Sequence, residues 1–120
     1  MGKMKKVLVI DDNAVNRKLA SAMLKKRGWE TTEADCGLGG LASLNVTEFD
    51  AVLLDISMPG MNGEEVCRAI RANEKTSHLR VIAYTAHALE SELERIMSAG
   101  FDDILVKPVS MDMLKSKLPD

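Results

Sequence analysis

Four short apolar runs in this chain each end in a polar residue whose side chain can do chemistry. The pair Asp11 and Asp12 follows the first run, and Asp55, Thr85 and Lys107 follow the others. If the runs are parallel strands of one open sheet, their carboxyl ends meet at a single edge, which is where such folds bind ligands. We therefore expect three carboxylates, one hydroxyl and one ammonium to share one crevice at that edge.

This set of groups suits a divalent cation and a phosphoryl group. Two carboxylates about 4 Å apart repel each other by roughly 4 kcal/mol at an effective dielectric constant near 20, so three together require a cation or a bound proton. Mg²⁺ and Mn²⁺ prefer such oxygen ligands. With the cation present, Asp55 can attack phosphorus and form an acyl phosphate, while Lys107 and Thr85 contact the phosphoryl oxygens.

The pattern that positions these residues alternates strand and helix five times with short joints. Such alternation predicts a parallel sheet covered by helices on both faces, here a doubly wound α/β fold of the flavodoxin-like (βα)5 type. Right-handed crossovers favour the strand order 2-1-3-4-5, which puts Asp11, Asp12 and Asp55 at the switch point between strands one and three. We expect strands at residues 6–10, 30–34, 51–55, 80–84 and 103–106, helices at 14–27, 37–44, 64–72 and 89–98, and a last helix that carries Met111, Leu114 and Leu118.

Local features of these elements lead to further predictions. The second strand is polar throughout, which suits an edge of the sheet. Asn13 is expected to cap the first helix, because asparagine is favoured at that position. The spacing of apolar residues predicts which face two of the helices bury. These stripes are Val15, Leu19, Ala22 and Met23 in the first helix, and Leu89, Leu93, Ile96 and Met97 in the fourth.

Size and composition argue against several classes of protein. The 120 residues predict one domain, residues 1–120. A net charge of -2 argues against nonspecific nucleic-acid binding, which needs a basic face. The first apolar run is too short, and too soon followed by acids, for a signal peptide or a membrane span. Cys36 and Cys67 have neither metal spacing nor a disulfide framework, so we expect reduced thiols in the cytoplasm.

Taken together, these marks resemble those of the receiver domains of two-component response regulators. That family has an acidic pair after the first strand, a phosphoaccepting aspartate after the third, Ser or Thr after the fourth, and Lys-Pro after the fifth. The resemblance runs from the first strand into the last helix, and residues 58–63 match the family's Met-Pro-Gly-Met-Asn-Gly loop. The marks read here Asp11 and Asp12, Asp55, Thr85 and Ala86, and Lys107 and Pro108.

The resemblance implies a role for each acidic residue. Asp55 would accept a phosphoryl group from a partner histidine kinase or histidine phosphotransfer protein, with Mg²⁺ bound beside it. Asp12 and Asp55 would hold the Mg²⁺ directly, and Asp11 would help through water. The backbone carbonyl of Ser57 would add a further ligand.

The resemblance also implies a switch. Thr85 and Lys107, the latter aimed by a cis bond to Pro108, would contact the phosphoryl group and so repack the face near the fourth helix and fifth strand. The output would be contact with a downstream protein or with another domain of a parent protein. This chain itself would bind neither nucleic acid nor membrane.

Two details of the sequence bear on the subfamily. Ile104 stands three residues before Lys107, where receivers often carry Tyr or Phe, so the family's aromatic relay lacks its usual residue here. The run Asp-Asp-Asn at residues 11–13, followed by Asn16 and Arg17, resembles receivers attached to hybrid histidine kinases.

Three alternatives use the same residues. A Mg²⁺-dependent phosphatase with an aspartyl-phosphate intermediate needs a second acid two residues after its nucleophile, and that place holds Ser57 after Asp55 and Asn13 after Asp11. A flavin carrier needs a phosphate-binding loop after the first strand, where Asp11 and Asp12 would repel the anion. A receiver that binds partners without being phosphorylated would not need the complete set of marks.

Overall fold

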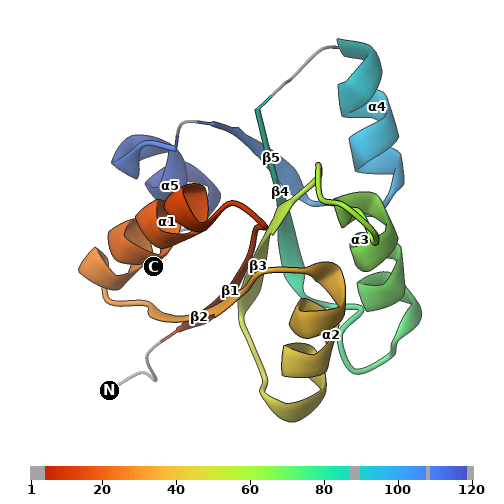
Figure 1. Cartoon of the computed structure of the whole chain (residues 1–120), viewed down its shortest axis with the longest axis horizontal. Coiled ribbons are helices and arrows are strands. Elements are labelled where there is room, and N and C mark those ends of the chain that lie inside the picture. Colours follow the sequence, from red (N-terminus) through yellow and green to blue (C-terminus); the bar gives the residue numbers. More distant parts are fainter. Residues whose placement is uncertain (1–4, 87–89, 108, 119–120) are drawn as a thin grey trace.

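The computed structural model describes residues 5–86, 90–107 and 109–118 of the chain. Within them, five parallel strands form a sheet in the order β2-β1-β3-β4-β5, as the sequence predicts (Figure 1). The polar strand β2 lies at one edge, which confirms its predicted place. The strands are β1 (Lys6–Ile10), β2 (Glu30–Ala34), β3 (Ala51–Asp55), β4 (Arg80–Thr85) and β5 (Asp103–Val106).

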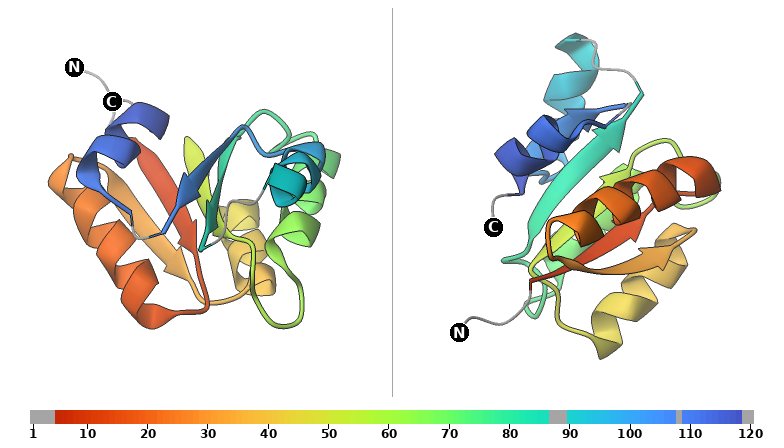
Figure 2. Two further views of the ribbon diagram at one scale, coloured as in Figure 1. Left: turned by 90° about the horizontal axis from the view of Figure 1, so that it is seen from above. Right: turned by 90° about the vertical axis from the view of Figure 1, so that its left-hand side faces the viewer.

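Helices cover both faces of this sheet, with α1 and α5 on one face and α2, α3 and α4 on the other (Figure 1, Figure 2). The ends of α1, α2, α3 and α4 agree with the predicted ones to within two residues. None of the helices in the described part of the chain has the length and apolar character needed to span a bilayer. The helices are α1 (Ala14–Lys26), α2 (Gly37–Val46), α3 (Gly63–Ala72), α4 (Glu90–Ser98) and α5 (Met111–Lys117).

Two apolar clusters fill the space between the sheet and its helices, one on each face. Successive side chains of a strand point to opposite faces, so Leu8 and Ile10 of β1 enter the cluster under α2, α3 and α4. Val7 and Val9 enter the cluster under α1 and α5. Strand β3 is buried along its whole length in the same way. The ends of β1 and β3 are therefore fixed by packing on both sides, and the acidic residues at those ends are held with them.

The buried face of α1 is not the predicted one. Val15 is 77% exposed, Leu19 is 40% exposed and Ala22 is also exposed. Of the predicted stripe, Met23 alone is partly buried against the core. The prediction of that face was wrong.

The true inner face of α1 carries small and polar residues that an apolar pattern does not detect. Ala20, Ser21 and Leu24 are buried, and Arg17 lies on the same face because these positions are spaced by three, four and seven residues. The guanidinium of Arg17 donates through Nε to Oε1 of Glu33 on β2 at 3.0 Å. This ion pair and the small side chains at 20 and 21 turn α1 so that its apolar stripe faces solvent.

In α4 the prediction of the buried face was partly correct. Ile96 is buried and Leu93 is half-buried, but Met97 is 44% exposed. Adjacent helical residues are turned by about 100°, so Ile96 and Met97 cannot both point to the core. Leu89 lies outside the described residues.

The start of α1 follows the acidic pair without an intervening loop. The side-chain oxygen of Asn13 accepts a hydrogen bond from the backbone N–H of Asn16 at 3.0 Å, which confirms Asn13 as the cap. Asp11 and Asp12 are therefore held between the buried end of β1 and a capped helix.

Gly63 allows α3 to begin against the end of β3. Its backbone N–H donates to the carbonyl of Ile56 at 3.1 Å. A Cβ atom at position 63 would overlap the carbonyl oxygen of Asp55 and lie 2.7 Å from the Cα of Ile56. Only glycine fits so close to this backbone, which carries one of the acidic residues.

We expect Gly63→Ala to lower the free energy of unfolding by about 1–3 kcal/mol, because backbone must move to admit the methyl group. Urea unfolding followed by the emission of Trp29 measures the change. The matched control is Gly39→Ala in α2, where the nearest atom is Sγ of Cys36 at 3.4 Å. That variant should be neutral or more stable by up to about 1 kcal/mol, since alanine favours helix. Equal stability of Gly63→Ala and the parent chain would contradict the close approach.

Candidate functional site

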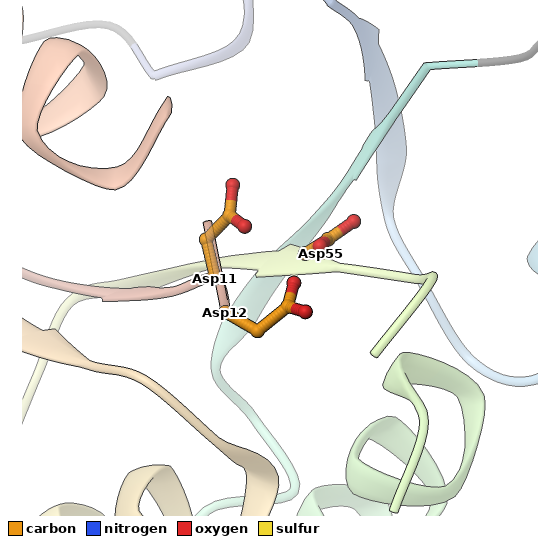
Figure 3. A group of neighbouring side chains, drawn as sticks. All are labelled: Asp11, Asp12 and Asp55. Carbon is orange, nitrogen blue, oxygen red and sulfur yellow. The ribbon is translucent and has the colours of Figure 1, made fainter. Parts of the chain in front are cut away.

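The acidic residues predicted for the sheet edge lie together. Asp11 and Asp12 follow β1 directly, and Asp55 is the last residue of β3, which pairs with β1. One carboxylate oxygen from each residue lies within 4.8 Å of those from the other two. Figure 3 shows the three side chains gathered where β1 and β3 end. The order of the strands thus brings two distant parts of the sequence to one point.

Lys107 also reaches this point, although it follows β5, two strands away from β3. Its Nζ lies 3.2 Å from Oδ2 of Asp11 and 3.4 Å from Oδ1 of Asp55. The backbone N–H of Lys107 donates to the carbonyl of Thr85 at 2.8 Å, which fixes the start of the side chain beside β4. With its side chain only 14% exposed, Lys107 supplies a largely buried positive charge between two buried carboxylates.

The three carboxylates have different surroundings. Asp11 and Asp55 are buried, whereas Asp12 is exposed. Oδ1 of Asp11 accepts the backbone N–H of Asn13 at 2.8 Å, and Oδ1 of Asp55 accepts that of Ser57 at 3.2 Å. The arrangement therefore has a dry inner side and a side that opens to water at Asp12.

Burial, followed by the negative charge of Asp11, raises the pKa of Asp55 to about 7. The ammonium of Lys107 acts in the opposite direction and does not outweigh them. Without a further cation, the carboxylates at this edge thus retain a proton at pH values where an ordinary aspartic acid is fully ionised.

Thr85 and Ser57 lie at the same edge of the sheet. Thr85 is the buried last residue of β4, one position beyond Tyr84, which pairs in register with Asp55. Ser57 is exposed and turns its backbone N–H toward Asp55. The residues singled out in the sequence thus belong to the ends of β1, β3, β4 and β5, which meet at one edge.

Arg17 is a residue of this region whose contact the sequence pattern does not predict. Its Nη1 donates to the backbone carbonyl of Asp11 at 2.8 Å, while its Nε pairs with Glu33. Burial alone would raise the pKa of Glu33, but hydrogen bonds from Lys18 and Arg17 outweigh it and hold that pKa below its usual value. A cation four residues after the helix cap and an acid within a polar strand were the available signal.

Two features that the resemblance singled out have different outcomes. Pro108, and with it the expected cis bond after Lys107, lies outside the described residues. Ile104 is half-buried and packs against the cluster under α2, α3 and α4. An aliphatic side chain thus fills the place where receivers often carry an aromatic one.

The donor set fits a hard divalent cation. The buried Oδ2 of Asp11 has no hydrogen-bond partner in the described part of the chain and faces the ammonium of Lys107. Exposed Asp12 leaves room for water, and Mg²⁺ keeps several waters when few protein ligands are offered. Carboxylates of Asp11, Asp12 and Asp55 together provide the oxygen ligands that such an ion prefers.

Comparison with known proteins agrees with the fold and with the family resemblance of the sequence. The response regulator receiver domain family matches residues 7–119. The chain is 37% identical over 119 residues to the chemotaxis protein CheY-3 of Vibrio cholerae, covering 98% of this chain and 92% of that protein. It is 38% identical over 108 residues to the sensor protein GacS of Pseudomonas syringae, but these span 88% of this chain and only 12% of GacS.

Solved structures lead to the same family. Chemotaxis protein CheY4 of Vibrio cholerae superposes with a TM-score of 0.92 at 28% identity, covering 97% of each chain. The receiver domain of the sensor histidine kinase PA1611 from Pseudomonas aeruginosa gives a TM-score of 0.87 at 32% identity, covering 95% of this chain and 93% of that one. That structure holds a magnesium ion in its active site cleft. The present chain therefore belongs to the response regulator receiver domain family, whose members are signalling domains of two-component systems.

Proposed function

We propose that this receiver domain is a phosphoacceptor in which Asp55 takes a phosphoryl group from the phosphohistidine of a partner histidine kinase or histidine phosphotransfer protein. The observation that supports this most is the meeting of Asp11, Asp12 and Asp55 with the ammonium of Lys107 at one sheet edge. Asp55 is a buried acid beside both a carboxylate, Asp11, and an ammonium, Lys107. Such an arrangement is typical of functional sites, because it costs stability.

Mg²⁺ is the ion that we assign to the acidic cluster, with Mn²⁺ as a substitute of similar chemistry. Asp12 and Asp55 would hold it directly, Asp11 through water, and the carbonyl of Ser57 would add a ligand. The ion supplies positive charge that offsets the repulsion between the aspartates and the incoming phosphoryl oxygens. The magnesium ion in the related PA1611 receiver domain supports this assignment.

The transfer itself is a displacement at phosphorus. A carboxylate oxygen of Asp55 forms the new P–O bond while the P–N bond to the donor histidine breaks, and the imidazole leaves as a neutral group after gaining a proton. Lys107 moves from its carboxylate partners to a phosphoryl oxygen, and the hydroxyl of Thr85 donates to another. The N–H of Ser57, which already faces Asp55, donates on the outer side. The product is an acyl phosphate on Asp55.

Capture of the phosphoryl oxygens by Thr85 provides the switch. Thr85 ends β4, and the chain from there leads to α4, so a shift of Thr85 is passed to the face formed by α4 and β5. An ion pair between Nε of Arg95 and Oε1 of Glu64, 2.8 Å apart, ties α4 to α3 in the present state. The signal would be read by a downstream protein or by a domain of a parent protein. Because the chain spans 12% of GacS but nearly all of CheY-3, both forms of output fit its relatives.

A phosphatase that turns over aspartyl phosphate needs a carboxylic acid two residues after its nucleophile. In this chain that position is Ser57, whose side chain cannot donate a proton as readily as an acid. The geometry therefore favours a phosphoacceptor over a turnover enzyme, and over a module that binds partners without being phosphorylated.

Asp55→Ala should abolish phosphorylation by acetyl phosphate in the presence of Mg²⁺, because the variant lacks the proposed acceptor carboxylate, which lies beside Lys107 and accepts the backbone N–H of Ser57. Phosphorus NMR and the emission of Trp29 measure the acyl phosphate and the conformational response. Asp35→Asn is the matched control, since Asp35 is an exposed aspartate that directly follows β2 at the same edge. The control should be phosphorylated like the parent chain. A metal-dependent acyl phosphate in Asp55→Ala would rule out Asp55 as the acceptor.

Asp55→Asn should make the metal-free protein more stable above neutral pH. Since the pKa of Asp55 is raised in the folded state to about 7, the folded chain holds more protons than the unfolded chain between its ordinary value of 3.8 and 7. Stability therefore falls as pH rises through that range. We expect the variant to exceed the parent by roughly 2–4 kcal/mol near pH 8, and the difference to vanish near pH 4.

Urea unfolding at a series of pH values, with chelator present, measures this difference. Saturating Mg²⁺ should stabilise the parent chain by RT ln(1 + [L]/Kd), about 2.7 kcal/mol at 100 times Kd, and should have little effect on the variant. A variant that is less stable than the parent above neutral pH would show that Lys107 already compensates the buried charges in full.

A further inference from the structure

The aromatic ring of Tyr84 lies beneath the ammonium of Lys107. Tyr84 is fully buried on β4, and Nζ of Lys107 is 4.8 Å from the centre of its ring. A cation within about 6 Å of a tyrosine ring centroid is attracted by the negative face of the ring. Among the residues that the structure describes, the ammonium of Lys107 therefore contacts two carboxylates and a ring.

The strand register explains how the ring comes to lie there. Tyr84 pairs with Asp55 on one side and with Leu105 on the other, so it stands at the centre of the edge between the acceptor strand and β5. Its side chain enters the cluster under α1 and α5, where it packs among buried apolar residues. The side chain of Lys107 must cross the end of β4 to reach Asp55, and it crosses over this ring.

A metal ion competes with Lys107 for the carboxylates but not for the ring. A divalent cation at the acidic cluster neutralises the aspartates and weakens their hold on Lys107. A lysine side chain has a flexible four-carbon stem and a strongly hydrated head, so an ammonium released from its partners would turn toward water. The ring carries no net charge for a metal ion to neutralise, and packing fixes its position. Its attraction for the ammonium of Lys107 therefore persists when metal binds.

We propose that Tyr84 is a positioning residue that keeps the ammonium of Lys107 over the end of β3, within reach of an incoming phosphoryl group, when the aspartates bind metal. The proposal rests on the phosphoacceptor function proposed above and adds to it a residue outside the family's marks. The ring would restrict the positions that the Lys107 ammonium samples before it contacts a phosphoryl oxygen.

The face of the ring is the group that acts, and the hydroxyl is not needed. Burial, and then the negative charge of Asp11, raises the pKa of Tyr84 to about 12, so the hydroxyl is neutral near pH 7. The side chain therefore neither transfers a proton nor carries charge in the reaction. Phenylalanine should serve in its place.

Two substitutions separate the ring from the space that it fills. Tyr84→Phe keeps the ring, whereas Tyr84→Leu removes it and leaves an apolar side chain. With saturating Mg²⁺ and acetyl phosphate, we expect the phosphorylation rate of Tyr84→Phe to stay within about twofold of the parent, and that of Tyr84→Leu to fall roughly three- to tenfold. The control is Phe101→Leu, which removes a buried ring from the other apolar cluster and should lower stability without changing the rate.

A graded series tests the electrostatic origin of the effect. Phenylalanine analogues with one, two and three ring fluorines at position 84 keep the shape of the side chain and progressively weaken the negative face of the ring. The rate should fall in step with fluorination if the ring attracts Lys107. A flat series, or a Tyr84→Leu variant with the parent rate, would overturn the proposal.

A measurement on the unphosphorylated protein keeps this test separate from the proposed function. The Hε protons of Lys107 should show an upfield ring-current shift by NMR in the parent and in Tyr84→Phe, with and without Mg²⁺, and lose it in Tyr84→Leu. Failure of acetyl phosphate to modify the parent chain would refute the phosphoacceptor function and leave this shift in place. Loss of the shift in the parent when Mg²⁺ is added would instead show that the ring does not hold Lys107, and would refute the role of Tyr84.

Discussion

The constraint on which the rest of this structure depends is an imbalance of charge at one edge of the sheet. Two buried carboxylates, Asp11 and Asp55, face a single ammonium from Lys107, and Asp12 adds a third carboxylate on the water side. Three acids against one base leave the fully ionised cluster two negative charges in excess. Below about pH 7 the metal-free protein lowers this excess by one charge through a proton retained on Asp55, whose pKa is raised by burial and by the charge of Asp11. A divalent cation carries the two positive charges that balance the fully ionised cluster. The repulsion that destabilises the metal-free site therefore favours metal binding.

The fold keeps the acids together against this repulsion by burying the strands that carry them and capping the helices that come next. Strands β1 and β3 are covered on both faces, and their side chains cannot move apart without opening both apolar clusters. After β1, Asn13 starts a helix at once, while Arg17 reaches back to the Asp11 carbonyl. After β3, Gly63 lets α3 begin against the Asp55 backbone. Repulsion between side chains is thus resisted by packing of the backbone, which is a stronger restraint than any one ion pair.

How far the sequence predicts this structure depends on which physical signal each element carries. Strands β1, β3, β4 and β5 follow from apolar runs that end in polar residues, because a buried strand must be apolar on both faces. The order of the strands follows from right-handed crossovers. The meeting of Asp11, Asp12 and Asp55 then follows from topology. The inner face of α1 does not follow, since Ala20, Ser21 and Arg17 pack inward while Val15 points to solvent. Shape and a partly buried ion pair outweigh hydrophobicity there, and neither is visible as periodicity. Contacts that depend on the register of the strands, such as that of Tyr84 with Lys107, likewise cannot be predicted from the sequence pattern.

Strand β4 emerges as the element that links the chemistry to both faces of the domain. Its last two residues are Tyr84, which is directed to the side of α1 and α5 and touches Lys107, and Thr85, the next residue along, whose carbonyl holds the Lys107 backbone. Tyr84 is also the register partner of Asp55. A shift at the end of β4 would therefore reach both the strand that carries Asp55 and the backbone of Lys107. Because position 104 on β5 holds isoleucine, the aromatic relay of the family lacks its usual residue here. In the proposed switch, β4, which pairs with both β3 and β5, would carry the signal without that residue.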